Sequence, residues 1–306
     1  MSNPSPPPQR DDPAGIFYAA FAYVMWGVMP LYWRLLGTMS AFELTAHRIF
    51  WSAIFAAGVA IARGQVGKII AIMRKPKVLG MLALTGLLIT ANWTTYIYTI
   101  ESHQLVEASL GYYINPLVSI ALGAVFLGEH LSKLRLAAIA LASVAVLVQT
   151  FELGHFPFIA IILALSFGFY GYFRKLAPVD ALDGFTVEVF VLFPFVAAFI
   201  GFLAVNGTGV FPKAGAFDDA ILIVGGPLTA IPLVMFAAGA RRIRLSTLGF
   251  LQYLCPSIML LLAILGFGEK FTLVHAWTFG AIWAALLLVA IDGQLSRVRP
   301  VKPVVE

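Results

Sequence analysis

Long apolar stretches separated by short polar connections run along almost the whole chain. A helix needs about 20 mostly apolar residues to cross the hydrocarbon core of a bilayer. These stretches are too long and continuous for the alternating strands of a membrane β-barrel. The pattern therefore predicts an all-α polytopic membrane protein. Its ten transmembrane helices are expected at Ala14–Trp33, Leu44–Ala62, Val78–Ile100, Ala108–Gly128, Leu136–Phe151, Phe156–Phe173, Phe185–Val205, Ala220–Ala240, Leu245–Gly268 and Phe271–Ile291.

The composition excludes several other classes of protein. Of the 306 residues, 60% are hydrophobic and 11% are charged, whereas soluble domains have about 25% charged residues. A soluble fold of this size could not bury so much apolar surface. Soluble, disordered and nucleic-acid-binding proteins are therefore excluded, and the lipid bilayer is the first expected partner. Residues 1–13 are polar, rich in proline and without the basic start of a signal peptide, which predicts a disordered tail before an uncleaved first span.

Lysine and arginine are concentrated in alternate connections between the predicted spans. Counting from the N-terminal tail, one alternating set of connections holds sixteen of the twenty basic residues. The other set holds three, namely Arg34, Lys213 and Lys270, and Arg48 lies inside a span. Since basic residues in short connections stay on the cytoplasmic side, both termini are expected in the cytoplasm. That placement requires an even number of spans.

The two halves of the chain can be overlaid at a shift of 140 residues. A single shared offset across several spans predicts a duplication, with a first repeat at 14–152, a second at 153–292 and a cytoplasmic tail at 293–306. Five spans per repeat is an odd number, so the repeats should enter the membrane from opposite sides, as in transporters that bind substrate near the midplane. The pairs that carry the overlay are Tyr113/Tyr253, Pro116/Pro256, Gly128-Glu129/Gly268-Glu269 and Tyr32-Trp33-Arg34/Tyr172-Phe173-Arg174.

Two matched prolines lie inside the fourth and ninth predicted spans. Pro116 and Pro256 each remove one backbone hydrogen bond, which frees the carbonyl groups of Tyr112 and Gln252. In lipid, such a carbonyl needs a partner or a water-filled cavity. We expect these kinked helices to line a substrate path, with a simple packing kink as the alternative.

Aromatic and polar side chains supply further candidates for this path. An apolar cavity with a few polar groups suits an organic solute, and Asn92 lies well inside its span. The alternative for the aromatic residues is an interfacial belt. With Tyr112, Pro116, Gln252 and Pro256, the candidates are Trp26, Tyr32, Asn92, Trp93, Tyr96, Tyr113, Asn115 and Tyr253.

Four ionisable residues lie in or at the ends of spans. Glu43 and His47 are four residues apart and share a helix face, and Arg48 is adjacent. Arg48 falls on Glu188 at the 140-residue shift, which suggests an ion pair across the pseudo-two-fold axis. The alternatives are that both charges snorkel to the surface or that they handle substrate or protons.

Enzyme and metal signatures are absent from the sequence. It contains no H-E-x-x-H, no G-x-S-x-G and no P-loop motif. The single cysteine, Cys255, is expected to be a packing residue, and no Cys/His cluster has metal-site spacing. We therefore expect no enzyme activity, no cofactor and no metal, and transport driven by a gradient or by exchange. A membrane enzyme and a non-transporting scaffold or sensor are the alternatives, and a homo-oligomer is left open.

The sequence resembles EamA-type transporters of the RarD branch, in the drug/metabolite transporter superfamily. This resemblance implies a bacterial inner-membrane permease of ten helices in two inverted repeats, exporting a small organic metabolite or drug-like solute. It also implies that the first, third and fourth helices of each repeat surround a cavity, while the fifth and tenth lie peripherally. The strings that carry it are Tyr23-Val24-Met25-Trp26-Gly27, Thr45-Ala46-His47-Arg48, Glu107 to Leu117, Phe126-Leu127-Gly128-Glu129, Phe167 to Arg174 and Arg244 to Tyr253.

Overall fold

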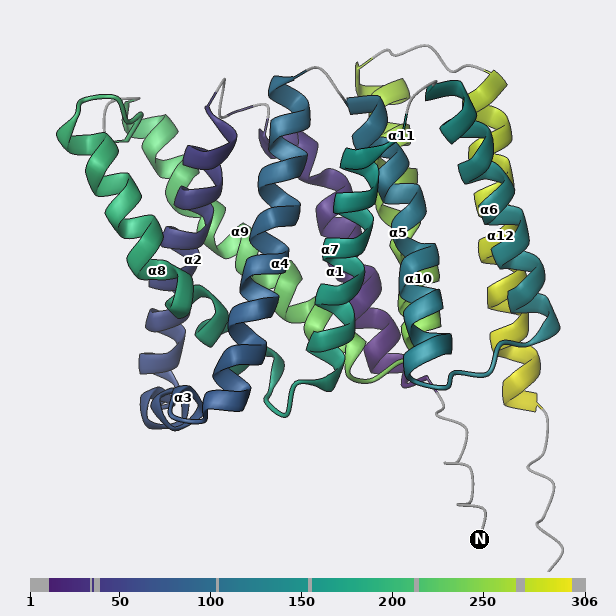
Figure 1. Ribbon diagram of the computed structural model, residues 1–306, viewed down its shortest axis with the longest axis horizontal. Coiled ribbons are helices and arrows are strands. Elements are labelled where there is room, and N and C mark those ends of the chain that lie inside the picture. Colours follow the sequence, from purple (N-terminus) through teal and green to yellow (C-terminus); the bar gives the residue numbers. More distant parts are fainter. Residues whose placement is uncertain are drawn as a thin grey trace, which may run out of the picture.

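The computed structural model describes residues 11–33, 35, 39–102, 105–153, 156–211, 215–267 and 273–298. Most of these residues are helical, which confirms the all-α prediction, and the long helices lie side by side in one bundle (Figure 1). The helices are α1 (Pro13–Trp33), α2 (Ala41–Ala62), α3 (Val66–Met73), α4 (Pro76–Glu101), α5 (Leu105–Phe126), α6 (Lys133–Leu153), α7 (Phe158–Leu176), α8 (Ala181–Val205), α9 (Ala216–Ala240), α10 (Leu245–Gln252), α11 (Leu254–Phe267) and α12 (Leu273–Val298).

Hydrophobicity and length identify membrane-crossing segments among these helices. Within the described ranges, five helical stretches are long and apolar enough to span a bilayer: Ala41–Ala62, Pro76–Thr99, Phe158–Leu176, Ala181–Val205 and Ala216–Ala240. Each overlaps a span predicted from the sequence. Residues 1–10 and 299–306 of the predicted tails, and the predicted turn at Gly268-Glu269, lie outside the described residues.

Two features of the helices differ from the sequence prediction. Helix α3 was not predicted, because its eight residues are too short to cross a bilayer. It lies at one end of the bundle, where Figure 1 shows it nearly end-on. The predicted span Leu245–Gly268 is divided at Tyr253 into α10 and α11, just before Pro256, which has no N–H for the Gln252 carbonyl. Helix α5, in contrast, continues through Pro116.

Polar contacts tie helix ends together at one end of the bundle. Asp11, just before α1, accepts a hydrogen bond from Arg244 Nη2 at 3.0 Å, at the start of α10. Lys175, near the end of α7, donates to the carbonyl of Ile243 at 2.5 Å. Arg135, at the start of α6, donates to Asp292 in the last part of α12 at 2.9 Å. The starts of α1, α6 and α10 therefore lie beside the ends of α7 and α12.

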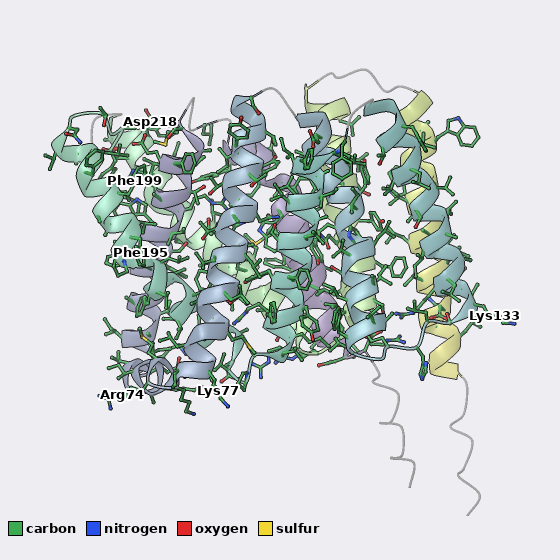
Figure 2. All side chains as sticks on the ribbon, viewed as in Figure 1. Arg74, Lys77, Lys133, Phe195, Phe199 and Asp218 are labelled. Atoms are coloured by element: carbon green, nitrogen blue, oxygen red, sulfur yellow. The ribbon has the colours of Figure 1, made fainter. Side chains whose placement is uncertain are left out.

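The same end of the bundle carries labelled basic residues. Figure 2 shows Arg74, Lys77 and Lys133 at this end, and Asp218 at the opposite end. Between the ends, Phe195 points outward from α8 with 71% of its surface exposed. An exposed aromatic side chain on a long apolar helix is suited to a lipid environment.

The central helices pack around an aromatic core, and α6 and α12 form a separate pair at one edge (Figure 1). Tyr23 of α1, Phe167 and Tyr170 of α7 and Phe236 of α9 belong to one cluster of buried side chains. The rings of Phe167 and Phe236 have their centroids 5.0 Å apart. The core thus joins helices from both halves of the chain.

Gly249 marks a close crossing between α10 and α5. A Cβ atom at this position would lie 2.7 Å from the carbonyl oxygen of Pro116 and 3.2 Å from Ile120 Cγ1. We predict that Gly249→Ala lowers the free energy of unfolding by about 1–3 kcal/mol, because a backbone oxygen cannot easily move away. Thermal melting in detergent measures this loss. Gly201→Ala is the matched control, since its Cβ would meet nothing within 4 Å, and equal melting of the two variants would contradict the close crossing.

Candidate functional site

A cavity of about 620 Å³ lies among the central helices, part of it open to the surroundings. Side chains from both halves of the chain line it, and most of them lie away from the ends of their helices. The lining residues are Tyr23, Trp26, Met29, Arg48, Asn92, Trp93, Tyr96, Tyr112, Asn115, Phe167, Gln252, Cys255 and Met259.

Aromatic rings form much of the cavity wall. Trp26 of α1 meets Phe167 of α7 edge to face, with 5.5 Å between ring centroids. Tyr96 of α4 and Tyr112 of α5 meet in the same way, also at 5.5 Å. Such pairs hold rings at defined angles, so the wall is apolar and shaped by helices of both halves.

Three amide side chains add polar groups to this wall. Asn92 Nδ2 donates to the Leu163 carbonyl at 2.9 Å and to Ser166 Oγ at 3.0 Å, which joins α4 to α7. Asn115 Oδ1 and Gln252 Oε1 are buried acceptors with no hydrogen-bond partner among the described residues. Because buried polar groups are normally satisfied, these two oxygens mark the places where the cavity is best suited to hold a ligand.

Arg48 brings the cavity its charge. Its Nε donates to Thr229 Oγ1 of α9 at 3.2 Å, and its Cζ lies 4.0 Å from the centroid of the Trp93 ring. A guanidinium over an indole face is a favourable cation–π arrangement. These contacts hold a buried guanidinium at the cavity wall.

The suggested ion pair between Arg48 and Glu188 is wrong in its partner. Glu188 Oε1 lies 3.5 Å from Nη1 of Arg174 and accepts a hydrogen bond from Thr85 Oγ1 at 2.6 Å. Arg174 reaches it from the end of α7, next to α8 in sequence, while Arg48 turns toward Trp93 and the cavity. Both members of the observed pair are almost completely buried, at 1% and 2% side-chain exposure.

Five of the predicted path residues do not line the cavity. The Tyr32 hydroxyl donates to the carbonyl of Ile221. Tyr253 donates to the Tyr113 carbonyl at 3.2 Å, and both rings belong to the core cluster beside α6 and α12. Pro116 and Pro256 are buried in the helices that carry the lining residues. They can shape the wall without forming it.

Glu43 and His47 lie near the start of α2, outside the cavity wall. Glu43 Oε1 accepts a hydrogen bond from the backbone N–H of Val210 at 2.7 Å and so fastens the connection after α8. The His47 ring lies 5.7 Å from that of Phe211 in the same connection. Their position indicates a role in fixing this connection.

Five lining residues were not predicted: Tyr23, Met29, Phe167, Cys255 and Met259. All five are apolar or aromatic side chains inside spans, where the sequence offers no sign of which way they face. Cys255 was expected to be a packing residue, and it is buried at 4% exposure while also reaching the cavity. Its position directly before Pro256 and one half-repeat from Asn115 was the signal that could have identified it.

Buried charges close the end of the bundle that carries the basic residues. Arg135 donates to Ser246 Oγ at 2.7 Å as well as to Asp292. The Glu129 carboxylate accepts hydrogen bonds from the backbone N–H groups of Leu245 at 2.5 Å and Ser246 at 2.9 Å. Glu129 is thus not only a surface charge after a turn, because it caps the start of α10.

Asp11 belongs to this same network. Burial alone would raise the pKa of its carboxyl, but the hydrogen bonds from Arg244 and Thr247 outweigh it and hold the pKa below its ordinary value. A lowered carboxyl pKa stabilises the folded contact above the unfolded pKa, and the contribution is lost as the pH falls through the folded pKa. The anchoring of α1 to α10 is therefore fully present at neutral pH.

Among the residues that the structure describes, no group of three His, Cys, Asp or Glu side chains is placed to hold a metal ion. Comparisons with known proteins give the chain its relatives. Residues 13–151 match the EamA-like transporter family. An uncharacterized transporter of Vibrio cholerae serotype O1 is 41% identical over 94% of this chain and 95% of its own length. Protein RarD of Escherichia coli (strain K12) is 38% identical over 94% of this chain and 97% of its own length.

A solved crystal structure shares the fold. It superposes with a TM-score of 0.69 over 91% of this chain and 98% of its own length, at 19% sequence identity. The sequence relatives and the apolar helices together identify a multi-pass membrane protein related to transporters.

Proposed function

Because the chain belongs to the EamA-like transporter family, we propose that it is a secondary transporter that exports a small organic solute across the bacterial inner membrane by alternating access. The observation that carries the proposal is the cavity between the two halves, with aromatic walls and a few polar groups. Cavities of this kind suit organic solutes. A site between repeats near the midplane is the usual location in secondary transporters.

The transporter consists of ten membrane spans in two inverted repeats. The first repeat is α1, α2, α4, α5 and α6, and the second is α7, α8, α9, the α10–α11 pair and α12. Four helix starts support this division, since Ala41, Pro76, Leu105 and Lys133 precede Ala181, Ala216, Leu245 and Leu273 by 140 residues each. Contacts at one end of the bundle also support it. They place the start of α1 beside the end of α7, and the start of α6 beside the end of α12.

Packing between the repeats follows the same symmetry. Helix α5 packs on α7 as α11 packs on α1, and α4 packs on α8 as α9 packs on α2. Gly86 faces Leu192 of α8, and Gly226, 140 residues later, lies against the backbone of Trp51 in α2. Matched contacts across an axis are what two conformations related by exchange of the repeats require.

The end with Arg74, Lys77 and Lys133 faces the cytoplasm, by the positive-inside rule. The Asp11, Glu129 and Arg135 network then closes the cytoplasmic side, and the cavity opens to that side when the network separates. Exchange of a metabolite pool tests the function. Purified protein in liposomes loaded with a bacterial metabolite extract should drive counterflow of a labelled component, measured with and without a pH gradient. No exchange above protein-free liposomes would contradict transport.

The proline at the α10–α11 break is expected to matter more for transport than its counterpart in α5. Pro256→Ala restores a backbone donor and lets α10 and α11 join, whereas α5 is already continuous through Pro116. We predict that Pro256→Ala slows counterflow by at least about tenfold, since favouring one conformation by about 1.4 kcal/mol suffices. Pro116→Ala is the matched control with a smaller effect. Equal rates for both variants, with unchanged melting temperatures, would contradict a hinge at Tyr253.

A further inference from the structure

Arg48 is the only residue with a charged side chain among the described residues that line the cavity. Its side chain is 6% exposed, and its guanidinium stays protonated at any physiological pH. Placing a cation this deep in a membrane protein is costly, and such residues usually mark a substrate or ion path. The cavity therefore has a positive potential that favours a negatively charged ligand over a neutral or positive one.

Two buried acceptors face the same cavity. Asn115 is 2% exposed and Gln252 is 4% exposed, and their side-chain oxygens have no hydrogen-bond partner among the described residues. A buried carbonyl oxygen without a donor is unfavourable. Asn115 lies on α5 and Gln252 on α10. A ligand with N–H or O–H groups would satisfy an acceptor in each repeat.

The remaining wall determines the shape of the ligand. Trp26 and Phe167 meet edge to face on one side, and Tyr96 and Tyr112 on another. Aromatic faces at fixed angles favour a flat apolar body over a compact inorganic ion. Trp93 is already stacked against the guanidinium of Arg48, so the charged group and the aromatic wall are adjacent.

We propose that the cavity binds a small organic anion with a flat apolar body and at least one N–H or O–H donor. Arg48 faces the anionic group, Asn115 and Gln252 accept from the donors, and the aromatic wall holds the body. This inference gives the substrate class for the proposed transport function and rests on it. Arg recognises carboxylate and phosphate groups through paired N–H donors, so either type of anionic group fits.

Four probes built on one benzene ring separate these contributions. They are 4-aminobenzoate (anion with donors), benzoate (anion without donors), 4-aminobenzamide (neutral with donors) and benzamidine (cation). Dissociation constants come from the rise in melting temperature with probe concentration, on purified full-length protein in detergent. 4-Aminobenzoate should bind at least about tenfold more tightly than 4-aminobenzamide, because hydrogen bonds to charged groups are the stronger ones. Benzoate should bind more weakly than 4-aminobenzoate, and benzamidine weakest of all.

Variants assign the preference to named residues. Arg48→Gln should abolish the difference between 4-aminobenzoate and 4-aminobenzamide, whereas Arg48→Lys should keep part of it. Arg63→Gln is the matched control, because this exposed arginine after α2 loses the same charge far from the cavity wall. Gln252→Met should reduce the difference between 4-aminobenzoate and benzoate. The ranking of the four probes on the unchanged protein does not depend on whether any variant folds.

The inference is overturned if none of the anions binds, or if the neutral or cationic probe binds as tightly as 4-aminobenzoate. It is also overturned if Arg48→Gln folds and keeps the anion preference. Counterflow of the same probes in liposomes separates this result from the fate of the transport proposal. Anion-selective binding without exchange leaves the site standing and removes transport. Exchange of solutes that is unaffected by Arg48→Gln leaves transport standing and removes the anion site.

Discussion

Arg174→Gln is expected to lower the free energy of unfolding by about 3–5 kcal/mol, because it leaves Glu188 buried without its counter-charge. Glu188 is 2% exposed, and its Oε1 has Arg174 Nη1 at 3.5 Å and Thr85 Oγ1 at 2.6 Å. The hydroxyl of Thr85 alone cannot offset the loss of the guanidinium. Arg174 also donates to the Ala181 carbonyl at 2.8 Å, which links the end of α7 to the start of α8. Thermal melting in detergent should therefore show a large decrease.

Paired substitutions separate the ion pair from other effects of the change. Glu188→Gln removes the stranded charge, so the double variant with Arg174→Gln should recover part of the lost stability. Arg63→Gln, at an exposed position, should melt as the unchanged protein does. A double-mutant cycle between Arg48 and Glu188 should give coupling below about 0.5 kcal/mol, the level for independent sites. Strong coupling in that cycle and none with Arg174 would contradict the observed pairing.

Cross-linking Glu129 to Ser246 is expected to abolish transport. In the structure a Glu129 oxygen lies 2.9 Å from the backbone nitrogen of Ser246, at the end assigned to the cytoplasm. Cysteines placed at both positions in a Cys255→Ser background can be joined by a short, cleavable thiol cross-linker. Because alternating access requires this end to separate in each cycle, counterflow should fall to the level of protein-free liposomes. Cleavage of the linker should restore it.

The single-cysteine variants, treated with the same reagent, are the controls for this experiment. They should retain counterflow, since one modified thiol leaves the two segments free to separate. Full activity of the cross-linked double variant would show that the contact between Glu129 and the start of α10 stays closed during transport. The proposed cytoplasmic closure would then be wrong.

Much of the fold could be predicted because bilayer thickness imposes a length on every span. The predicted spans and the observed helices agree within a few residues at most ends, as for Ala220–Ala240 and α9. Helix α3 could not be predicted from that constraint, since eight residues at the end of the bundle have no membrane thickness to match. The interruption at Tyr253 was predictable from Pro256, but the continuity of α5 through Pro116 depends on its neighbours.

The error at Arg48 shows what a repeat in the sequence does and does not contain. Two residues matched at the 140-residue shift are related by symmetry, but they meet only if both lie near the axis. Tyr113 and Tyr253 do meet, through the hydrogen bond from Tyr253 to the Tyr113 carbonyl. Glu188 instead pairs with Arg174, which is brought close by the short connection between α7 and α8.

Seven of the twelve path residues predicted from the sequence line the cavity. The others show where sequence reasoning ends. Consecutive residues in a helix point about 100° apart, so Tyr112 and Tyr113 cannot both face the same space. Tyr112 lines the cavity, and Tyr113 packs beside α6 and α12. Which of two adjacent tyrosines faces inward is decided by the neighbouring helices, and these are known only once the bundle is assembled.

The central claim is that solute passes through the cavity, and Cys255 allows a direct measurement of it. Cys255 is the only cysteine in the chain and lines the cavity. Proteoliposomes carrying out counterflow are treated with N-ethylmaleimide, and the modified fraction of Cys255 is measured by mass spectrometry. The account predicts that counterflow falls in proportion to modification, while Cys255→Ser protein is insensitive. Unchanged counterflow with Cys255 fully modified would show that the solute does not pass through this cavity.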